Sequence, residues 1–161
     1  MDYKIIIVLY MSKNLNLFLL FAVFLLLACN PESQPINYGS DMCEFCRMSI
    51  VDQRFGSEIV TQKGKIFKFD AVECMVNYLE DREEDESKLE YILTNTLDAP
   101  GELIDVQECR FLRSKNMPSP MGMFINPFKD STLAIRSQVE NSGAIHDWTS
   151  LRREFKKCDR N

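Results

Sequence analysis

Histidine and tryptophan are scarce in this chain. Only one histidine, His146, and one tryptophan, Trp148, occur among 161 residues. Histidine is the usual acid–base group near neutral pH and the commonest metal ligand in proteins. A zinc enzyme or a histidine-dependent catalytic centre therefore has almost no side chains from which to be built. We expect His146 to lie on the surface or at the cap of a helix.

Positive charge is also in short supply. Lysine and arginine number 19 against 24 aspartate and glutamate residues, which gives a formal net charge of −5. A protein that binds the phosphate backbone of a nucleic acid needs a concentration of basic side chains. The charge balance therefore argues against nucleic acid as a partner. With 45% hydrophobic residues, the chain has enough apolar content for a modest core.

The sequence has no hydrophobic run long enough to cross a membrane comfortably. The apolar stretch at residues 15–28 is interrupted at Asn16, and a transmembrane helix needs about 20 apolar residues. Its length suits the hydrophobic region of a signal peptide, roughly 7–15 residues. We predict a signal peptide over residues 1–28. Met11 is a second candidate initiator, because a short basic segment typical of a signal peptide begins there.

The apolar stretch ends in Leu26-Leu27-Ala28-Cys29, which resembles a bacterial lipobox. In that motif the cysteine is acylated and becomes the mature N-terminus, so Cys29 is the predicted lipidation site. The alternative is an ordinary signal peptide, or a membrane anchor that happens to end in cysteine. Residues 29–40 are polar and rich in proline and serine, and they predict a lipidated flexible tether. We therefore expect a palmitoylated lipoprotein of the cell envelope, anchored to a bacterial membrane and facing the periplasm.

Sulfur is concentrated in one short segment. The residues from Cys43 to Met48 have the spacing C-x-x-C-x-M, which brings two thiols and a thioether close together in the sequence. Soft sulfur ligands of this mixed kind select Cu(I) over most biological metals. The motif therefore predicts a Cu(I) site that includes Cys43, Cys46 and Met48.

A disulfide between Cys43 and Cys46 is the main alternative, because cysteines outside the cytoplasm tend to be oxidised. The chain has six cysteines. Once Cys29 is assigned to lipid, an odd number remains, so at least one is free, bound to metal or paired with another chain. A redox-active pair of the thioredoxin kind lies at the start of a helix, directly after a strand. Here the motif follows a polar segment instead, so that fold context is missing.

The first half predicts the order strand, strand, helix, strand. Residues 57–61 and 65–69 alternate on either side of a glycine-containing turn, as in a β-hairpin. Asp70 can cap a helix over residues 71–79, and residues 89–94 have the composition of a strand.

The second half predicts a similar order, followed by a terminal helix. The expected segments are short apolar stretches at 103–106 and 109–112, a strand at 122–127, a helix from 129–131 to Gly143, a strand at 144–146 and a helix at 148–157. The halves, about 41–98 and 99–161, are each too small to be stable alone. We predict an α+β fold in which two ββαβ-type halves pack as one compact body.

The order of motifs resembles the NosL family of copper-binding lipoproteins, which are associated with nitrous oxide reductase assembly. After C-x-x-C-x-M come Gly-Lys-Ile-Phe-Lys-Phe-Asp, Glu-Cys-Met-Val-Asn-Tyr-Leu and Ser-Pro-Met-Gly-Met-Phe. The resemblance covers nearly all of residues 41–155. It implies a copper-binding domain of two ββαβ halves over residues 41–161. It also points most strongly to Cys46 and Met121 as Cu(I) ligands, with Cys43 and Met48 as further candidates.

The other sulfur-bearing residues have less support as ligands. Met123 lies on the same strand face as Met121 and can equally fill the core. Cys74 falls in the apolar helix, where a buried structural thiol is the preferred interpretation. Cys109 and Cys158 are most simply structural or free. A structural zinc site would need four cysteine or histidine ligands, Cys74 and Cys109 among them, and no spacing signal supports it.

Taken with the predicted anchor, the resemblance implies a non-enzymatic Cu(I) metallochaperone that delivers copper for the maturation of nitrous oxide reductase in denitrification. It also implies an ABC-type transporter as a partner at the membrane. Two alternatives stay open. One is a periplasmic thiol–disulfide oxidoreductase that uses Cys43 and Cys46, and the other is a copper-handling lipoprotein for another cuproenzyme.

Overall fold

The computed structural model describes residues 31–82 and 85–158 of the chain. The predicted signal peptide, the lipobox and Cys29 lie outside the described residues. Within the described part, no helix is both long enough and apolar enough to span a bilayer. Residues from Pro31 onward form one compact unit.

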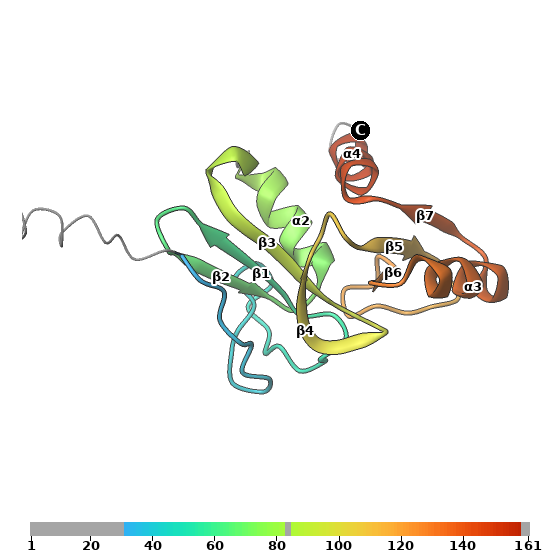
Figure 1. Cartoon of the computed structure of the whole chain (residues 1–161), viewed down its shortest axis with the longest axis horizontal. Coiled ribbons are helices and arrows are strands. Elements are labelled where there is room, and N and C mark those ends of the chain that lie inside the picture. Colours follow the sequence, from blue (N-terminus) through green and yellow to red (C-terminus); the bar gives the residue numbers. More distant parts are fainter. Residues whose placement is uncertain (1–30, 83–84, 159–161) are drawn as a thin grey trace, which may run out of the picture. The chain divides into compact units, whose positions relative to one another are not determined.

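The first sheet has four antiparallel strands in the order β2-β1-β3-β4 (Figure 1). The strands are β1 (Ser57–Thr61), β2 (Ile66–Phe69), β3 (Leu89–Thr96) and β4 (Ala99–Asp105). The β1–β2 hairpin forms where the sequence predicts it, with Glu58 opposite Lys68. Helix α2 (Val72–Asp81) follows β2 after two residues, and most of its side chains are buried because apolar residues occupy six of its eight positions from Val72 to Leu79.

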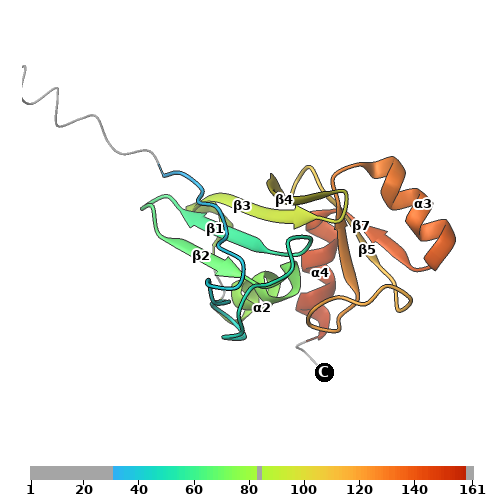
Figure 2. The same ribbon diagram turned by 90° about the horizontal axis from the view of Figure 1, so that it is seen from below.

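The second sheet has three antiparallel strands in the order β6-β5-β7. The remaining elements are β5 (Arg110–Arg113), β6 (Ile125–Phe128), β7 (Ala144–His146), the 3-10 helix η1 (Glu86–Lys88), α3 (Ser131–Asn141) and α4 (Trp148–Cys158). Phe111 and Leu112 are neighbours in β5 and therefore face opposite sides of the sheet. Leu112 clusters with Ala134 of α3, whereas Phe111 lies in the larger core with Trp148 of α4. Figure 2 shows α3 and α4 on the two sides of this sheet.

The predicted fold class is confirmed, because two small antiparallel sheets and three α-helices form an α+β fold. One strand is placed differently from the expected halves. Residues 99–161 are expected to form the second half, whereas β4 pairs with β3, with Thr94 opposite Ile104, and extends the first sheet. The reason is the short turn at Leu97 and Asp98, since antiparallel strands joined by two residues pair with each other.

The start of α2 also differs from the prediction. Asp70 is expected to cap this helix, but the N-cap residue is Ala71, which has no side-chain cap. The carboxylate of Asp70 is buried instead, and burial raises its pKa, an effect that the backbone N–H of Val51 partly offsets. Asp130 does cap α3, because its carboxylate accepts a hydrogen bond from the N–H of Thr132 at 2.6 Å.

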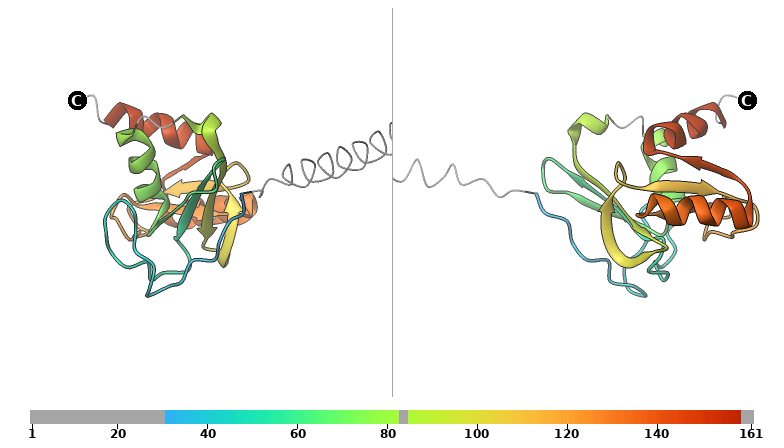
Figure 3. Two further views of the ribbon diagram at one scale, coloured as in Figure 1. Left: turned by 90° about the vertical axis from the view of Figure 1, so that its left-hand side faces the viewer. Right: turned by 45° about the vertical axis from the view of Figure 1, so that its right-hand side comes forward.

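Helices α2 and α4 connect the two sheets (Figure 3). Helix α2 contacts β1 and β2 of the first sheet and β6 of the second, and α4 contacts β5, β7 and α2. A largely buried ion pair reinforces the contact between the helices, since Arg152 of α4 reaches Glu80 of α2 at 2.9 Å and Glu86 at 3.3 Å. Loss of one partner would leave a buried charge uncompensated. The two halves therefore share one core.

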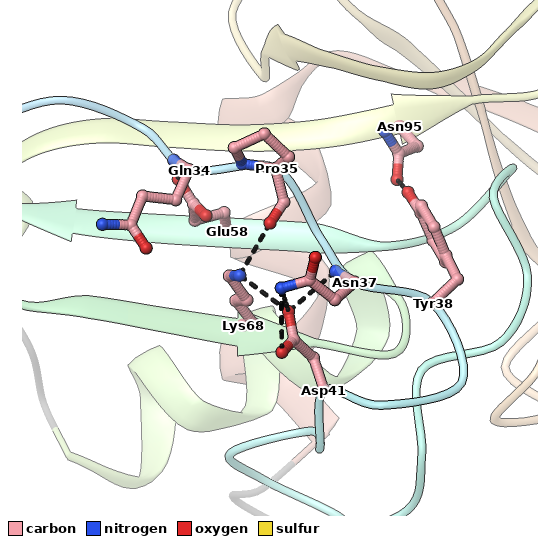
Figure 4. A network of polar contacts seen from close by, with 8 residues as sticks. All are labelled: Gln34, Pro35, Asn37, Tyr38, Asp41, Glu58, Lys68 and Asn95. Carbon is pink, nitrogen blue, oxygen red and sulfur yellow. Dashed lines mark hydrogen bonds and ion pairs between the residues drawn. The ribbon is translucent and has the colours of Figure 1, made fainter.

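The N-terminal segment, residues 31–41, runs along the first sheet without helix or strand and turns at residues 38–40, and we call it the strap (Figure 4). Side chains of the sheet hold it in place. The carboxylate of Glu58 accepts a hydrogen bond from the N–H of Gln34 at 3.0 Å. The ammonium of Lys68 forms an ion pair with Asp41 at 2.7 Å. Both sheet residues belong to the β1–β2 hairpin, so the hairpin is the surface on which the strap lies.

The strap corrects the expectation for residues 29–40. The sequence predicts a flexible tether there, whereas from Pro31 onward the chain is docked on the sheet. Ile36 is buried, and the Tyr38 hydroxyl donates a hydrogen bond to the Asn95 side chain at 2.5 Å. Two large side chains in a polar stretch thus add to the polar contacts that attach the strap to the core.

Candidate metal centre

Three cysteine side chains converge at the start of α2. The sulfur atoms of Cys43, Cys46 and Cys74 lie within 4.8 Å of one another, and we call this group the cysteine cluster. Cys43 and Cys74 are fully buried, Cys46 is partly exposed, and all three are free thiols. In the described part of the chain, no other set of three or more histidine, cysteine or carboxylate side chains converges in this way.

A tight turn presents Cys43 and Cys46 on the same side of residues 41–50, which we call the cysteine loop. The N–H of Cys43 donates to the carbonyl of Met48 at 2.8 Å and closes the loop at its base. The N–H of Arg47 donates to the carbonyl of Cys43 at 3.1 Å, and Arg47 has a φ of 64°, in the left-handed region. This reversal of the chain brings the two thiols together.

The β1–β2 hairpin and α2 bring Cys74 to the same place. The end of β2 lies beside the cysteine loop, because the N–H of Glu44 donates to the carbonyl of Lys68 at 2.8 Å. The chain then enters α2, and Cys74 lies in its first turn. The backbone N–H of Asp70 donates to the sulfur of Cys43. The strand end, the helix start and the cysteine loop therefore meet at the cluster.

The three thiols differ in proton affinity. Cys43 accepts a hydrogen bond from the Cys74 thiol and others from backbone N–H groups, which together lower its pKa to about 5. The hydrogen bond to Cys43, with burial, raises the pKa of Cys74 well above its usual range. Burial also raises the pKa of Cys46. Of the three thiols, Cys43 therefore loses its proton most readily, whereas Cys46 and Cys74 hold theirs more tightly.

This donor set suits a soft ion of low coordination number. Thiolate sulfur is the ligand type that Cu(I) prefers. Because the pKa of Cys43 is lowered, its proton leaves more easily when a metal binds. A structural zinc site usually has four ligands, whereas the cluster has three. Cys109 does not belong to it, since its thiol donates to the carbonyl of Asp105 at 3.4 Å and burial raises its pKa to about 12.

The structure brings two of the predicted ligands together. Cys43 and Cys46 both lie in the cluster. Met48 is 59% exposed, and its backbone N–H donates to the sulfur of Cys46. Cys74, which the sequence favours as a structural thiol, is buried but is a member of the cluster. No pattern in the sequence marks Cys74 for this role, because the role depends on the contact between the end of β2 and the cysteine loop.

Residues 117–124, which we call the methionine loop, lie against α2, the helix that carries Cys74. Met121 and Met123 are partly buried and pack against the core that contains the cluster. The N–H of Met121 donates to the carboxylate of Glu73 at 3.2 Å. The sulfur of Met123 accepts a weak hydrogen bond from the Asn77 amide at 3.9 Å. The backbone of Met121 is thus attached to the residue that directly precedes a cluster cysteine, and the thioether of Met123 is engaged by α2.

The one histidine of the chain has a different role. The imidazole Nε2 of His146 lies 3.3 Å from the carboxylate of Glu154. Its side chain is partly buried in β7, rather than on the surface or at a helix cap as expected. Arg113 of β5 pairs with the same carboxylate, so His146 belongs to a contact between the second sheet and α4.

The fold and the cluster define a small α+β protein with a sulfur-rich candidate metal centre. The profile of the NosL family matches residues 36–155, and the chain belongs to this family, as its resemblance predicts. The crystal structure of the copper chaperone NosL from Shewanella denitrificans has a similar fold, with 17% sequence identity and a TM-score of 0.64. The similarity covers 75% of this chain and 96% of that one. No curated protein matches the chain.

Proposed function

We propose that this protein is a non-enzymatic metallochaperone that carries Cu(I) on its cysteine cluster. The observation that carries the proposal is the convergence of three cysteine sulfurs within 4.8 Å. Membership of the NosL family supports it, because a protein of similar fold is described as a copper chaperone. Copper is then the cargo of the protein rather than a resident cofactor.

The arrangement favours transfer as well as binding. Cys46 is the partly exposed sulfur of the cluster, so a soft ligand of a partner can approach the ion there. Cys43, whose pKa is lowered, is the cysteine that most readily becomes a negatively charged ligand for the cation. Met121 supplies a neutral thioether, which cannot form a disulfide. A partner thiolate or thioether can add to a low-coordinate ion before the first cysteine leaves it.

The proposed site of action is the cell envelope, with the acylated Cys29 as a membrane anchor and the copper site on the periplasmic side. The proposed client is nitrous oxide reductase, or another cuproenzyme of the same compartment. An ABC-type transporter is the proposed partner at the membrane. Family membership and the lipobox support these assignments.

The test is Cu(I) binding to the fragment 30–161 without oxygen, measured in competition with a chromophoric chelator. We expect a stoichiometry near one and a large loss of affinity in Cys46→Ser. Cys109→Ser is the matched control, because Cys109 is a free thiol outside the cluster. Absence of any competition, or equal effects of the two substitutions, would contradict the proposal.

A thiol–disulfide oxidoreductase is the second candidate, because the lowered pKa of Cys43 and the neighbouring thiols are features of reactive cysteines. Such an enzyme should reduce insulin disulfides without any metal. Thiol exchange gives Met121 no role, so Met121→Leu should leave reductase activity intact. A chaperone should instead lack reductase activity and bind Cu(I) more weakly after the same substitution.

A further inference from the structure

Glu73 is a buried carboxylate whose hydrogen-bond partners lie in one stretch of chain. It is fully buried in the first turn of α2. The carboxylate accepts hydrogen bonds from the Ser119 hydroxyl and from the N–H groups of Met121 and Ile125, the latter two at 3.2 Å. A carboxylate removed from water is costly unless it is hydrogen-bonded. The hydrogen-bond donors of the methionine loop and of the first residue of β6 offset this cost.

The methionine loop in turn depends on these bonds for its shape. It contains no helix or strand, and Gly122 and Phe124 have positive φ angles of 71° and 65°. While Ser119 donates to Glu73, its hydroxyl oxygen accepts a hydrogen bond from the N–H of Phe124 at 2.8 Å. The carbonyl of Ser119 also accepts the N–H of Gly122 at 3.1 Å. Ser119 therefore connects the buried carboxylate to both sides of the turn around Met121.

Asn77, one helical turn further along α2, makes a second contact between this helix and the methionine loop. Residues four apart lie on the same face of a helix, so Glu73 and Asn77 both meet the methionine loop. The Asn77 amide reaches the sulfur of Met123 at 3.9 Å. Cys74 follows Glu73 directly and turns toward the cysteine cluster. One helix thus fixes the methionine loop and one cluster cysteine relative to each other.

We propose that Glu73, the neighbour of the cluster residue Cys74, is a positioning residue that holds the methionine loop against α2, so that the Met121 thioether serves as a further soft ligand. The inference rests on the proposed function and adds a residue to it. Removal of groups that orient metal ligands typically costs about 10–100-fold in metal affinity. We therefore expect Glu73→Gln to lower Cu(I) affinity by about tenfold or more, while the cysteines still bind the ion.

The substitution Glu73→Gln keeps the shape of the side chain and changes its hydrogen bonding. One carboxylate oxygen becomes an NH₂ group, which faces the N–H and O–H donors of the methionine loop and cannot accept from them. The loop then loses part of its attachment. Glu58→Gln is the matched control, because Glu58 is also a fully buried carboxylate but holds the strap instead.

The experiment follows the methionine methyl groups of the full chain by NMR during titration with Ag(I), a redox-inert substitute for Cu(I). Met121→Leu identifies the resonance. In the native protein and in Glu58→Gln, the Met121 methyl resonance should shift as the first equivalent binds. In Glu73→Gln it should stay in place, although the free-thiol count falls as in the native protein. A merely structural role of Glu73 would lower stability without this selective loss.

A Met121 methyl resonance that still moves in Glu73→Gln, as it does in the native protein, would overturn the inference. So would a native protein that binds Ag(I) through cysteine with no response at Met121, and the proposed function would survive that result. A native protein that binds no soft metal would instead overturn the proposed function. Ser119→Ala removes one hydrogen bond from the same carboxylate and repeats the test with a smaller expected loss, in case Glu73→Gln folds poorly.

Discussion

At the scale of single residues, Cys43 has the most unusual surroundings. It is fully buried, yet it accepts hydrogen bonds from the Cys74 thiol and from backbone N–H groups such as that of Asp70. These bonds hold its pKa at about 5, against an ordinary value of 9.0. These surroundings favour the thiolate form of Cys43, which suits a singly charged soft ion.

This lowered pKa should make the metal-free protein less stable in acid. A group with a lower pKa in the folded chain stabilises the fold above its unfolded pKa, and this stabilisation is lost as the pH falls through the folded pKa. The contribution of Cys43 should be complete above pH 9.0 and disappear as the pH falls to about 5. In urea unfolding, the stability advantage of the native chain over Cys43→Ser should be larger above pH 9.0 and should shrink as the pH falls toward 5. A difference that does not change with pH would contradict the assignment.

Cys74 contributes both a sulfur and a hydrogen bond, and two substitutions separate these roles. Cys74→Ser removes the soft ligand but keeps a hydroxyl donor toward Cys43, whereas Cys74→Ala removes both. We expect both variants to bind Cu(I) more weakly, because a sulfur ligand is lost. Only Cys74→Ala should raise the pKa of Cys43, which is visible as loss of thiolate ultraviolet absorbance at neutral pH. Equal absorbance in the two variants would show that the thiol of Cys74 does not stabilise the Cys43 thiolate.

At the scale of elements, the β1–β2 hairpin could be predicted from the sequence, but the meeting of its end with the cysteine loop could not. The hairpin follows from alternating side chains around Gly64, whose φ of 76° suits glycine. The direction in which α2 aims Cys74 depends on packing against two sheets, and local periodicity carries no information about that contact. Sequence proximity likewise favours Met48 as a ligand, whereas the turn at Arg47 leaves its side chain largely exposed.

The left-handed residue Arg47 should control the geometry of the cysteine loop. Its φ of 64° is strongly disfavoured for β-branched side chains. Arg47→Val should therefore lower the free energy of unfolding by about 1–2 kcal/mol and weaken Cu(I) binding. Arg47→Gly accepts the same φ and should keep both properties close to native. Both variants lose the same exposed ion pair with Glu44, which is worth little. Equal Cu(I) affinity in the two variants would contradict this role.

At the scale of the whole molecule, the composition of two segments does not indicate the structure that they adopt. The strand β4 contains Pro100 and Gly101, which are poor strand residues and are tolerated because β4 lies at an edge of its sheet. The strap has the composition of a linker, yet Ile36 is buried. Neither the pairing of β4 nor the docking of the strap leaves a periodic pattern in the sequence. The hairpin, the helices and the α+β class do leave such patterns, and they were predictable.

Membrane attachment through Cys29 is a prediction for the whole protein, and it concerns residues that the structure does not describe. Burial of an acyl chain is worth about 0.8 kcal/mol per CH₂, so two or three chains bind a bilayer far more firmly than one. Cys29→Ser should release the protein into the soluble fraction of the envelope or leave an uncleaved precursor. Cys109→Ser should fractionate like the native chain. A mature-length Cys29→Ser protein that still fractionates with membranes would show that another feature attaches it.

The docked strap predicts that Gly56 cannot be replaced without a loss of stability. A Cβ atom at this position would lie 2.7 Å from the Asn95 side-chain oxygen and 2.8 Å from the Cδ1 of Ile36. Alanine must therefore displace the strap and the hydrogen bond between Tyr38 and Asn95. Since burial of an isoleucine side chain is worth about 1.5–3 kcal/mol, Gly56→Ala and Ile36→Ala should each lower the free energy of unfolding by that order. Both disrupt the same contact, so the double variant should lose clearly less than the sum. Additive losses in urea unfolding would show that Gly56 is small for a reason other than the strap.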